Sequence, residues 1–155
     1  MIKRRSLERI GTVAGALSAA VLLAVTQASA VTAEVERATA LTGPSTTDGW
    51  LCTSVGPSTA HTAQACYSSL GDWLNIYDGK ADGYSAVMDW EIRDPNNKVY
   101  RYGATFNADG DGADRYKNKD FPETNYSIRF RTCLGHWSTK LIEAGTCSAW
   151  LTTST

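Results

Sequence analysis

The chain has 155 residues, of which 43% are hydrophobic, 10% aromatic and 20% charged. This composition is typical of one globular domain and excludes disordered, collagen-like and membrane-spanning chains. The formal net charge is −1 overall and −4 without residues 1–30, which contain four basic side chains and one acidic side chain. Because the remainder has no cluster of Lys and Arg, nucleic acids and membrane surfaces are disfavoured as partners.

Residues 1–30 have the organisation of a secretory signal peptide. Basic side chains between positions 3 and 9 precede an apolar run from Ile10 to Val25, and Ala28-Ser29-Ala30 supplies the small residues of a cleavage site. The apolar run is shorter than the roughly 20 residues that a membrane-spanning helix needs. The sequence therefore predicts a secreted, extracellular protein that begins at Val31 and keeps no membrane attachment after cleavage.

A flexible N-terminal arm is predicted over residues 31–48, followed by one domain over residues 49–155. The arm is rich in Ala, Thr and Glu, has no aromatic residue, and reaches Gly43-Pro44 before the aromatic-rich body begins. Its pattern fits either a short helix or a strand. Such an arm can fray or become ordered on a partner's sheet. The candidate partner-binding residues are Val31, Ala33, Val35, Leu41, Trp50 and Trp137, where the two tryptophans have the alternative role of covering one end of the domain.

All four cysteines, Cys52, Cys66, Cys133 and Cys147, follow the predicted cleavage site. An even number of cysteines in an exported chain predicts two disulfides. The first two and the last two are equally far apart, with turn-forming residues between them, which favours two local bonds over crossed pairing. Each bond contributes about 3 kcal/mol of stability in the chain-entropy model. A zinc site is disfavoured, because the two histidines are not spaced as ligands.

A series of short strands is predicted after Trp50. Period-two alternation is clearest over residues 84–92, returns over 100–106 after a turn, and appears again over 126–131. The expected inward-facing residues of the first two runs are Tyr84, Ala86, Met88, Trp90 and Ile92, then Tyr100, Tyr102, Ala104 and Phe106. Further strands are expected near 50–56, 63–69, 73–78 and 146–152, and a helix of about two turns near 138–144.

These strands predict an all-β fold, an antiparallel β-sandwich of about seven strands stapled by the two disulfides. Its core is expected to contain Trp90 and Phe130, which lie on apolar strand faces.

Residues 107–114 resemble the oxygen-rich first half of a calcium loop, in which Asp109, Asp111 and Asp114 would be the ligands. Asn118 stands where a bidentate glutamate is needed, and Arg115 brings a positive charge to the ring. A solvated hairpin loop is therefore favoured over a calcium site, and no cofactor is expected.

No motif for catalysis is present in the sequence. The chain has neither Gly-x-Ser-x-Gly nor His-Glu-x-x-His, and bridged cysteines offer no thiol nucleophile. His61 and His136 lie in loops, and Asp89 and Glu91 alternate on the polar face of one strand, where they could resemble the carboxylate pair of a glycosidase. A non-catalytic role is favoured.

Several segments carry a resemblance to known proteins. Leu51-Cys52, Gln64-Ala65-Cys66-Tyr67, the run from Asp82 to Ala86 and the run from Gly145 to Ala149 together look like small four-cysteine secreted β proteins of high-GC Gram-positive bacteria. Among these, the small adaptor subunit of umbrella-shaped secreted toxin particles is similar in size and tail design. This resemblance implies a β domain that bridges two larger subunits, with the tail from Val31 to Thr47 inserted into one of them.

A second resemblance is to subtilisin-inhibitor-like proteins, whose first disulfide loop is similar to Cys52 through Cys66 with Gly56-Pro57-Ser58 inside. Those inhibitors tie down their reactive loop with a further cysteine, and this chain has none between Cys66 and Cys133. That departure puts inhibition in doubt.

The function predicted from the sequence is a secreted, non-catalytic protein-binding or adaptor module in an extracellular assembly. The alternatives are a carbohydrate or cell-wall binding module, a protease inhibitor and a small secreted hydrolase. A glycan partner would be favoured by a coplanar, solvent-accessible pair among Trp50, Trp73, Trp137 and Tyr116.

Overall fold

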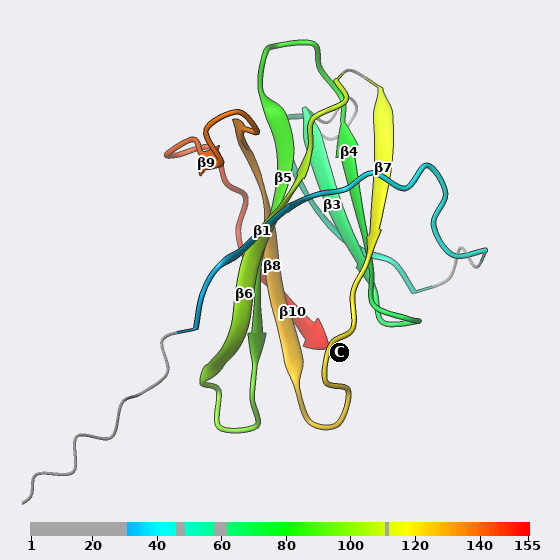
Figure 1. The fold of residues 1–155 in the computed structure, drawn as a ribbon, viewed down its shortest axis with the longest axis vertical. Coiled ribbons are helices and arrows are strands. Elements are labelled where there is room, and N and C mark those ends of the chain that lie inside the picture. Colours follow the sequence, from blue (N-terminus) through cyan, green and yellow to red (C-terminus); the bar gives the residue numbers. More distant parts are fainter. Residues whose placement is uncertain (1–30, 46–48, 58–61, 111) are drawn as a thin grey trace, which may run out of the picture.

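The structure is a computed structural model that describes residues 31–45, 49–57, 62–110 and 112–155. The predicted signal peptide, residues 1–30, lies outside this described part. Ten strands in the described residues form two sheets that pack face to face (Figure 1). The all-β sandwich predicted from the sequence is confirmed.

Sheet A contains six strands, which are β1 (Glu34–Arg37), β6 (Val99–Asn107), β5 (Ser85–Arg93), β8 (Ser127–His136) and β10 (Leu151–Ser154) in spatial order, with β9 (Leu141–Ile142) also paired to β8. Sheet B contains β2 (Leu51–Val55), β3 (Ala63–Ser68), β4 (Trp73–Asp78) and β7 (Ala113–Asn118). Neighbouring strands run antiparallel, except that β1 runs parallel to β6.

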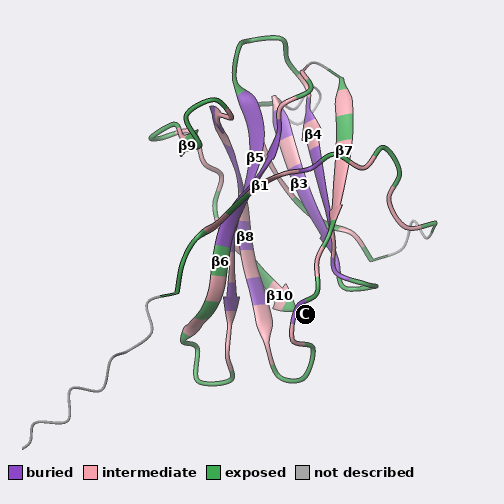
Figure 2. Ribbon diagram, in the orientation of Figure 1, coloured by how far each residue is buried: buried purple, intermediate pink, exposed green. Residues whose placement is uncertain are grey.

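The main core lies between the two sheets, where the alternation of β5 directs Met88, Trp90 and Ile92 toward sheet B. These three side chains are fully buried and share one apolar cluster with residues of β3, β4 and β8. Across the interface, the ring of Tyr67 lies 6.2 Å from that of Phe130. Figure 2 shows buried residues concentrated on β3, β4 and β5 and exposed residues at the turns. The predicted core positions of Trp90 and Phe130 are confirmed.

The predicted inward face of β6 is wrong. Tyr100 and Tyr102 are 47% and 37% exposed, and Phe106 packs in a second apolar cluster that does not share the main core. The opposite face of β6 meets the core because the large Trp90 indole needs room. Gly103 lies opposite Trp90 and leaves that room, and the indole Nε1 donates a hydrogen bond to Thr105 Oγ1 at 3.2 Å.

The two disulfides join Cys52 to Cys66 and Cys133 to Cys147, which confirms the predicted local pairing. The first bond crosses from β2 to β3, and the second ties β8 to the segment that leads into β10. Two disulfides in a small domain are typical of extracellular proteins. Within the described ranges, no helix has the length and apolar character to cross a membrane.

Two further elements differ from the sequence predictions. Strand β7 begins at Ala113, inside the calcium-like pattern of residues 107–114, and pairs along its whole length with β4. The segment expected to be a short helix near residues 138–144 is a turn followed by β9. In both places a polar or mixed sequence gains its order from a neighbouring strand and not from its own pattern.

Candidate functional site

The arm, defined here as the described residues 31–45, lies against the domain. Strand β1 places Glu34 beside Gly103 and Arg37 beside Phe106 of β6. The arm then crosses the open side of the sandwich toward sheet B (Figure 1), where Ala40 and Tyr116 exchange two backbone hydrogen bonds of 3.1 and 2.9 Å. The arm is therefore an integral part of the domain that connects the margins of both sheets.

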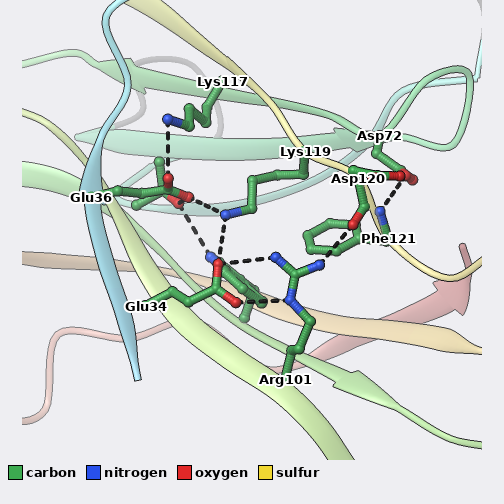
Figure 3. A network of polar contacts seen from close by, with 10 residues as sticks. Glu34, Glu36, Asp72, Arg101, Lys117, Lys119, Asp120 and Phe121 are labelled. Carbon is green, nitrogen blue, oxygen red and sulfur yellow. Dashed lines mark hydrogen bonds and ion pairs between the residues drawn. The ribbon is translucent and has the colours of Figure 1, made fainter. Parts of the chain in front are cut away.

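Two carboxylates fix the arm on its inner side. The Arg101 guanidinium donates two hydrogen bonds to Glu34, at 2.8 and 3.0 Å. Lys119 Nζ donates to Glu34 at 2.9 Å and to Glu36 at 2.5 Å, and Lys117 Nζ lies 3.1 Å from Glu36. Figure 3 shows both glutamates pointing from the arm toward these three cations. Paired charge-assisted hydrogen bonds of this kind set the register of the arm.

Two of the cations, Lys119 and Arg101, lie over aromatic rings of the core. Lys119 Nζ is 4.9 Å from the centre of the Trp90 ring, and the Arg101 guanidinium is 5.2 Å from the centre of the Phe121 ring. We call Trp90, Arg101, Lys117, Lys119 and Phe121 the docking patch. The side chain of Lys119 is only 6% exposed. Since a buried ammonium group is costly without anionic partners, the patch requires carboxylates, and the arm supplies them.

Glu34 and Arg101 shift each other's pKa. The hydrogen bonds from Arg101, with help from Lys119, lower the pKa of Glu34 from its ordinary value near 4.5 to about 2. The same hydrogen bonds, which Arg101 donates to Glu34, raise the pKa of Arg101. Both groups therefore stay charged near neutral pH.

The outer side of the arm carries the predicted contact residues. Val31 and Val35 are 40% and 43% exposed, Leu41 is 72% exposed, and Ala33 is exposed as well. Strand β1 ends the described strand order of sheet A, so one side of its backbone has no neighbouring strand in that order. Val35 lies between Glu34 and Glu36 on β1 and therefore faces away from them, and Val31, Ala33 and Leu41 are further exposed apolar side chains of the arm.

The two candidate tryptophans are half-buried. The ring centres of Trp50 and Tyr116 lie 6.3 Å apart, and the rings are tilted by 60°. The ring centres of Trp137 and Phe106 lie 5.7 Å apart, with a tilt of 57°. Neither pair is the coplanar platform that a glycan partner would favour. Trp50 belongs to the arm region, because Gly43 of the arm packs against the same Tyr116 ring.

The two described calcium candidates, Asp109 and Asp114, are each engaged by other side chains. Asp109 is held by the guanidinium groups of Arg37 and Arg115, and the hydrogen bond from Arg115 lowers its pKa. Asp114 accepts a hydrogen bond of 3.0 Å from Asn75. Asp111 lies outside the described residues. In the described part of the chain, no group of three acidic, His or Cys side chains is arranged to hold a metal ion.

The two carboxylates that could resemble a glycosidase pair, Asp89 and Glu91, are each paired with an arginine. Asp89 pairs with Arg131 at 2.8 Å, and Glu91 pairs with Arg93 at 2.6 Å. Burial raises the pKa of Asp89, and the hydrogen bond from Arg131 opposes that rise.

Of the two histidines, His136 lies in the described part of the chain. His136 is the last residue of β8 and pairs with Leu141 of β9, so the predicted loop position is wrong. Its ring centre lies 4.9 Å from that of Tyr84. His61, together with residues 58–60 of the inhibitor-like loop, lies outside the described residues.

Sequence reasoning did not single out Glu34, Glu36, Arg101 or Lys119. A signal for them exists, because Glu34-x-Glu36 and Lys117-x-Lys119 have the same period of two and opposite charges. Two such segments present their charges on one face each when they are extended, so they are complementary as strands.

No protein-family model matches this chain, and no curated protein sequence matches it. A crystal structure of an endonuclease/exonuclease/phosphatase from Beutenbergia cavernae is similar over 70% of this chain and 27% of its own length, with 13% sequence identity and a TM-score of 0.33. Likeness at this level carries no argument about function.

Proposed function

We propose that this protein is a secreted, non-catalytic binding module that joins other proteins in an extracellular assembly. The observation that carries the proposal is that Val31, Val35 and Leu41 are exposed on an arm whose Glu34 is held by Arg101 and Lys119. Apolar side chains held rigidly at a sheet margin are typical of protein-binding sites, because their burial needs no further ordering of the chain.

The mode of binding that fits this arrangement is strand addition. A terminal strand offers backbone N–H and C=O groups to an incoming strand, and neighbouring side chains give specificity. The partner strand would lie beside β1 and cover Val35. The arm need not leave the domain for this, which differs from the insertion into a larger subunit that the resemblance to toxin-particle adaptors implies. A larger subunit of such a particle is the first partner to test.

The compartment is part of the proposal. The two disulfides favour an oxidising environment, and the signal-peptide pattern of residues 1–30 offers the export route.

The test is affinity purification from culture supernatant of the producing organism with three tagged forms of the chain beginning at Val31. These are the wild type, Leu41→Asp in the arm, and Leu70→Asp as a matched control, since Leu70 is 57% exposed in the turn between β3 and β4. The wild type and Leu70→Asp are expected to recover the same specific partner, and Leu41→Asp to recover at least tenfold less of it. Equal recovery by all three forms, or no partner with the wild type, would contradict the proposal.

A further inference from the structure

The face of sheet A that points away from sheet B carries charged side chains on two neighbouring strands. On β5, Asp89, Glu91 and Arg93 alternate with buried core residues, and Arg129 and Arg131 do the same on β8. The register places Asp89 opposite Arg131 and Glu91 opposite Arg129. These five side chains therefore share one face of the sheet, with three positive and two negative charges.

Both carboxylates on this face already have an arginine partner. The Arg131 guanidinium donates to Asp89 at 2.8 Å. Glu91 lies opposite Arg129 but accepts two hydrogen bonds from Arg93, at 3.1 and 2.6 Å. Within the described residues, Arg129 forms no hydrogen bond or ion pair, and its Nε is buried without a partner. One guanidinium charge on this face is thus left without an anion.

Arg129 is held in position by an indole ring. The guanidinium carbon of Arg129 lies 4.3 Å from the centre of the Trp150 ring, and that of Arg131 lies at the same distance. Trp150 directly precedes β10, which ends the described strand order of sheet A. An indole attracts a cation but has no net charge with which to neutralise it. Arg129 is therefore a fixed, half-buried cation that lacks a counter-charge.

We propose that Arg129, stacked on Trp150, is a binding site for a carboxylate group. A guanidinium group presents parallel N–H donors that match the two oxygens of a carboxylate. A singly charged carboxylate fits better than the more highly charged phosphate, because one positive charge is left over and Asp89 and Glu91 lie nearby. The inference does not depend on the proposed binding function, which uses exposed residues of the arm.

The site is built for a ligand because little has to be ordered when the ligand binds. The stacking on Trp150 already restricts the long Arg129 side chain, so less conformational entropy is lost on binding. One guanidinium group is expected to hold a free carboxylate with a dissociation constant on the order of 10 mM. The carboxylate can belong to a small acid or to a Glu or Asp side chain of a peptide, and the test separates these sources.

The test is a titration of the ¹⁵N-labelled mature chain at pH 6.5, followed by NMR of the arginine Nε–H and tryptophan indole N–H groups. The probes are sodium acetate, the blocked tripeptide acetyl-Gly-Glu-Gly-amide, inorganic phosphate, and sodium chloride at equal ionic strength. Acetate and the tripeptide are expected to shift the Arg129 and Trp150 signals saturably, and chloride is not. A tripeptide constant at least fivefold below that of acetate assigns the site to a peptide side chain, and equal constants assign it to a free acid.

Two variants locate the binding. Arg129→Gln removes the guanidinium group and is expected to weaken acetate binding at least tenfold, as followed on the Trp150 signal. Lys98→Gln is the matched control, since it removes one positive charge from an exposed turn, and is expected to bind within twofold of the wild type.

The inference is overturned if acetate and the tripeptide give no saturable shift of the Arg129 signal, or if chloride gives the same shift. Tighter binding of phosphate than of acetate, or unchanged binding by Arg129→Gln, also overturns it. If Arg129→Gln does not fold, the residue-resolved shifts of the wild type still decide the result. Since only purified chain and small probes are used, recovery of a protein partner from supernatant has no bearing on it.

Discussion

Lys119 is the residue on which the docking of the arm depends most. Its ammonium group touches two carboxylates of the arm and one indole of the core, and its side chain is 6% exposed. By comparison, Lys117 also pairs with Glu36, but its side chain is 36% exposed. Both lysines therefore form an ion pair with Glu36, but the side chain of Lys119 is far less exposed than that of Lys117.

Replacing Lys119 by Met is expected to lower the free energy of unfolding by about 2 kcal/mol, since removing one partner of a buried pair leaves the other charges without compensation and Glu34 is partly hydrated here. Lys117→Met is the control and is expected to cost less than about 1 kcal/mol, as for exposed ion pairs. Urea unfolding followed by tryptophan fluorescence measures both. Equal losses for the two variants would show that burial of Lys119 adds nothing.

Gly103 is the second critical residue, because strand β1 and the Trp90 indole approach it from two sides. A Cβ at this position would lie 2.7 Å from Trp90 Cζ2 and would also collide with the Glu34 carbonyl oxygen. Gly103→Ala is therefore expected to destabilise the domain by about 1–3 kcal/mol, as overpacked positions do. Tyr102→Ala, at the exposed neighbouring position, is expected to change the stability by less than about 1 kcal/mol. Thermal unfolding of the two variants compares them, and an unchanged midpoint for Gly103→Ala would contradict the placement of β1.

At the scale of the element, the arm is held by ion pairs and not by a large apolar face, so its docking depends on pH. The pKa of Glu34 is about 2 in the docked arm and near 4.5 in a free chain. A carboxyl whose pKa is lower in the folded state stabilises that state above its ordinary pKa and loses the effect as the pH falls. Arm docking should thus be fully present above about pH 5 and weaken progressively between pH 4.5 and 2.

Hydrogen exchange of the arm amides at pH 5 and pH 3 measures this dependence, after correction for the intrinsic effect of pH on exchange. Glu34→Gln is the matched variant, since it keeps the shape of the side chain and cannot titrate. Its arm protection is expected to be lower at pH 5 and to change less between the two pH values than that of the wild type. The same pH dependence in both proteins would remove Glu34 as its cause.

The elements also show which part of the fold the sequence can predict. The alternation over residues 84–92 predicts strand β5 (Ser85–Arg93), because Met88, Trp90 and Ile92 are buried and the polar residues between them are not. Strands β1 and β7 lack an apolar alternation of this kind, because most of their residues are charged or polar. Their order comes from partners that are far away in sequence, which a local pattern cannot reveal.

The inversion of β6 has a related cause. Tyr100, Tyr102 and Phe106 form the more apolar side of this strand, yet Gly103 and Thr105 face the core. The deciding factor is the size of Trp90 on the neighbouring strand. Close packing between two strands therefore outweighs the hydrophobicity of one of them.

At the scale of the whole molecule, the two disulfides lie in different environments. Cys133 is fully buried and shares the second apolar cluster with Val87 and Phe106, whereas Cys52 is exposed. Replacing Cys133 and Cys147 by Ala is expected to cost about 3 kcal/mol from the lost crosslink and further stability from the weakened cluster. Replacing Cys52 and Cys66 by Ala is expected to cost about 3 kcal/mol alone. Urea unfolding of both variants checks the order, and a larger loss for the Cys52–Cys66 variant would contradict it.

The molecule as a whole combines a rigid scaffold with an arm that is docked on it. The inner side carries the carboxylates that meet the docking patch, and Val31, Val35 and Leu41 of the arm are exposed. The proposed binding function uses these exposed side chains. It requires that the arm is ordered on the domain.

Amide hydrogen exchange of the mature chain at neutral pH tests that requirement most directly. The Ala38 amide donates to the Phe106 carbonyl at 2.9 Å, and the Ala40 amide donates to the Tyr116 carbonyl at 3.1 Å. Both amides are expected to exchange at least about a hundredfold more slowly than in an unstructured peptide, as hydrogen-bonded amides of a stable sheet do. Exchange of Ala38 and Ala40 at the rate of an unstructured peptide, with β5 and β6 still protected, would contradict the account.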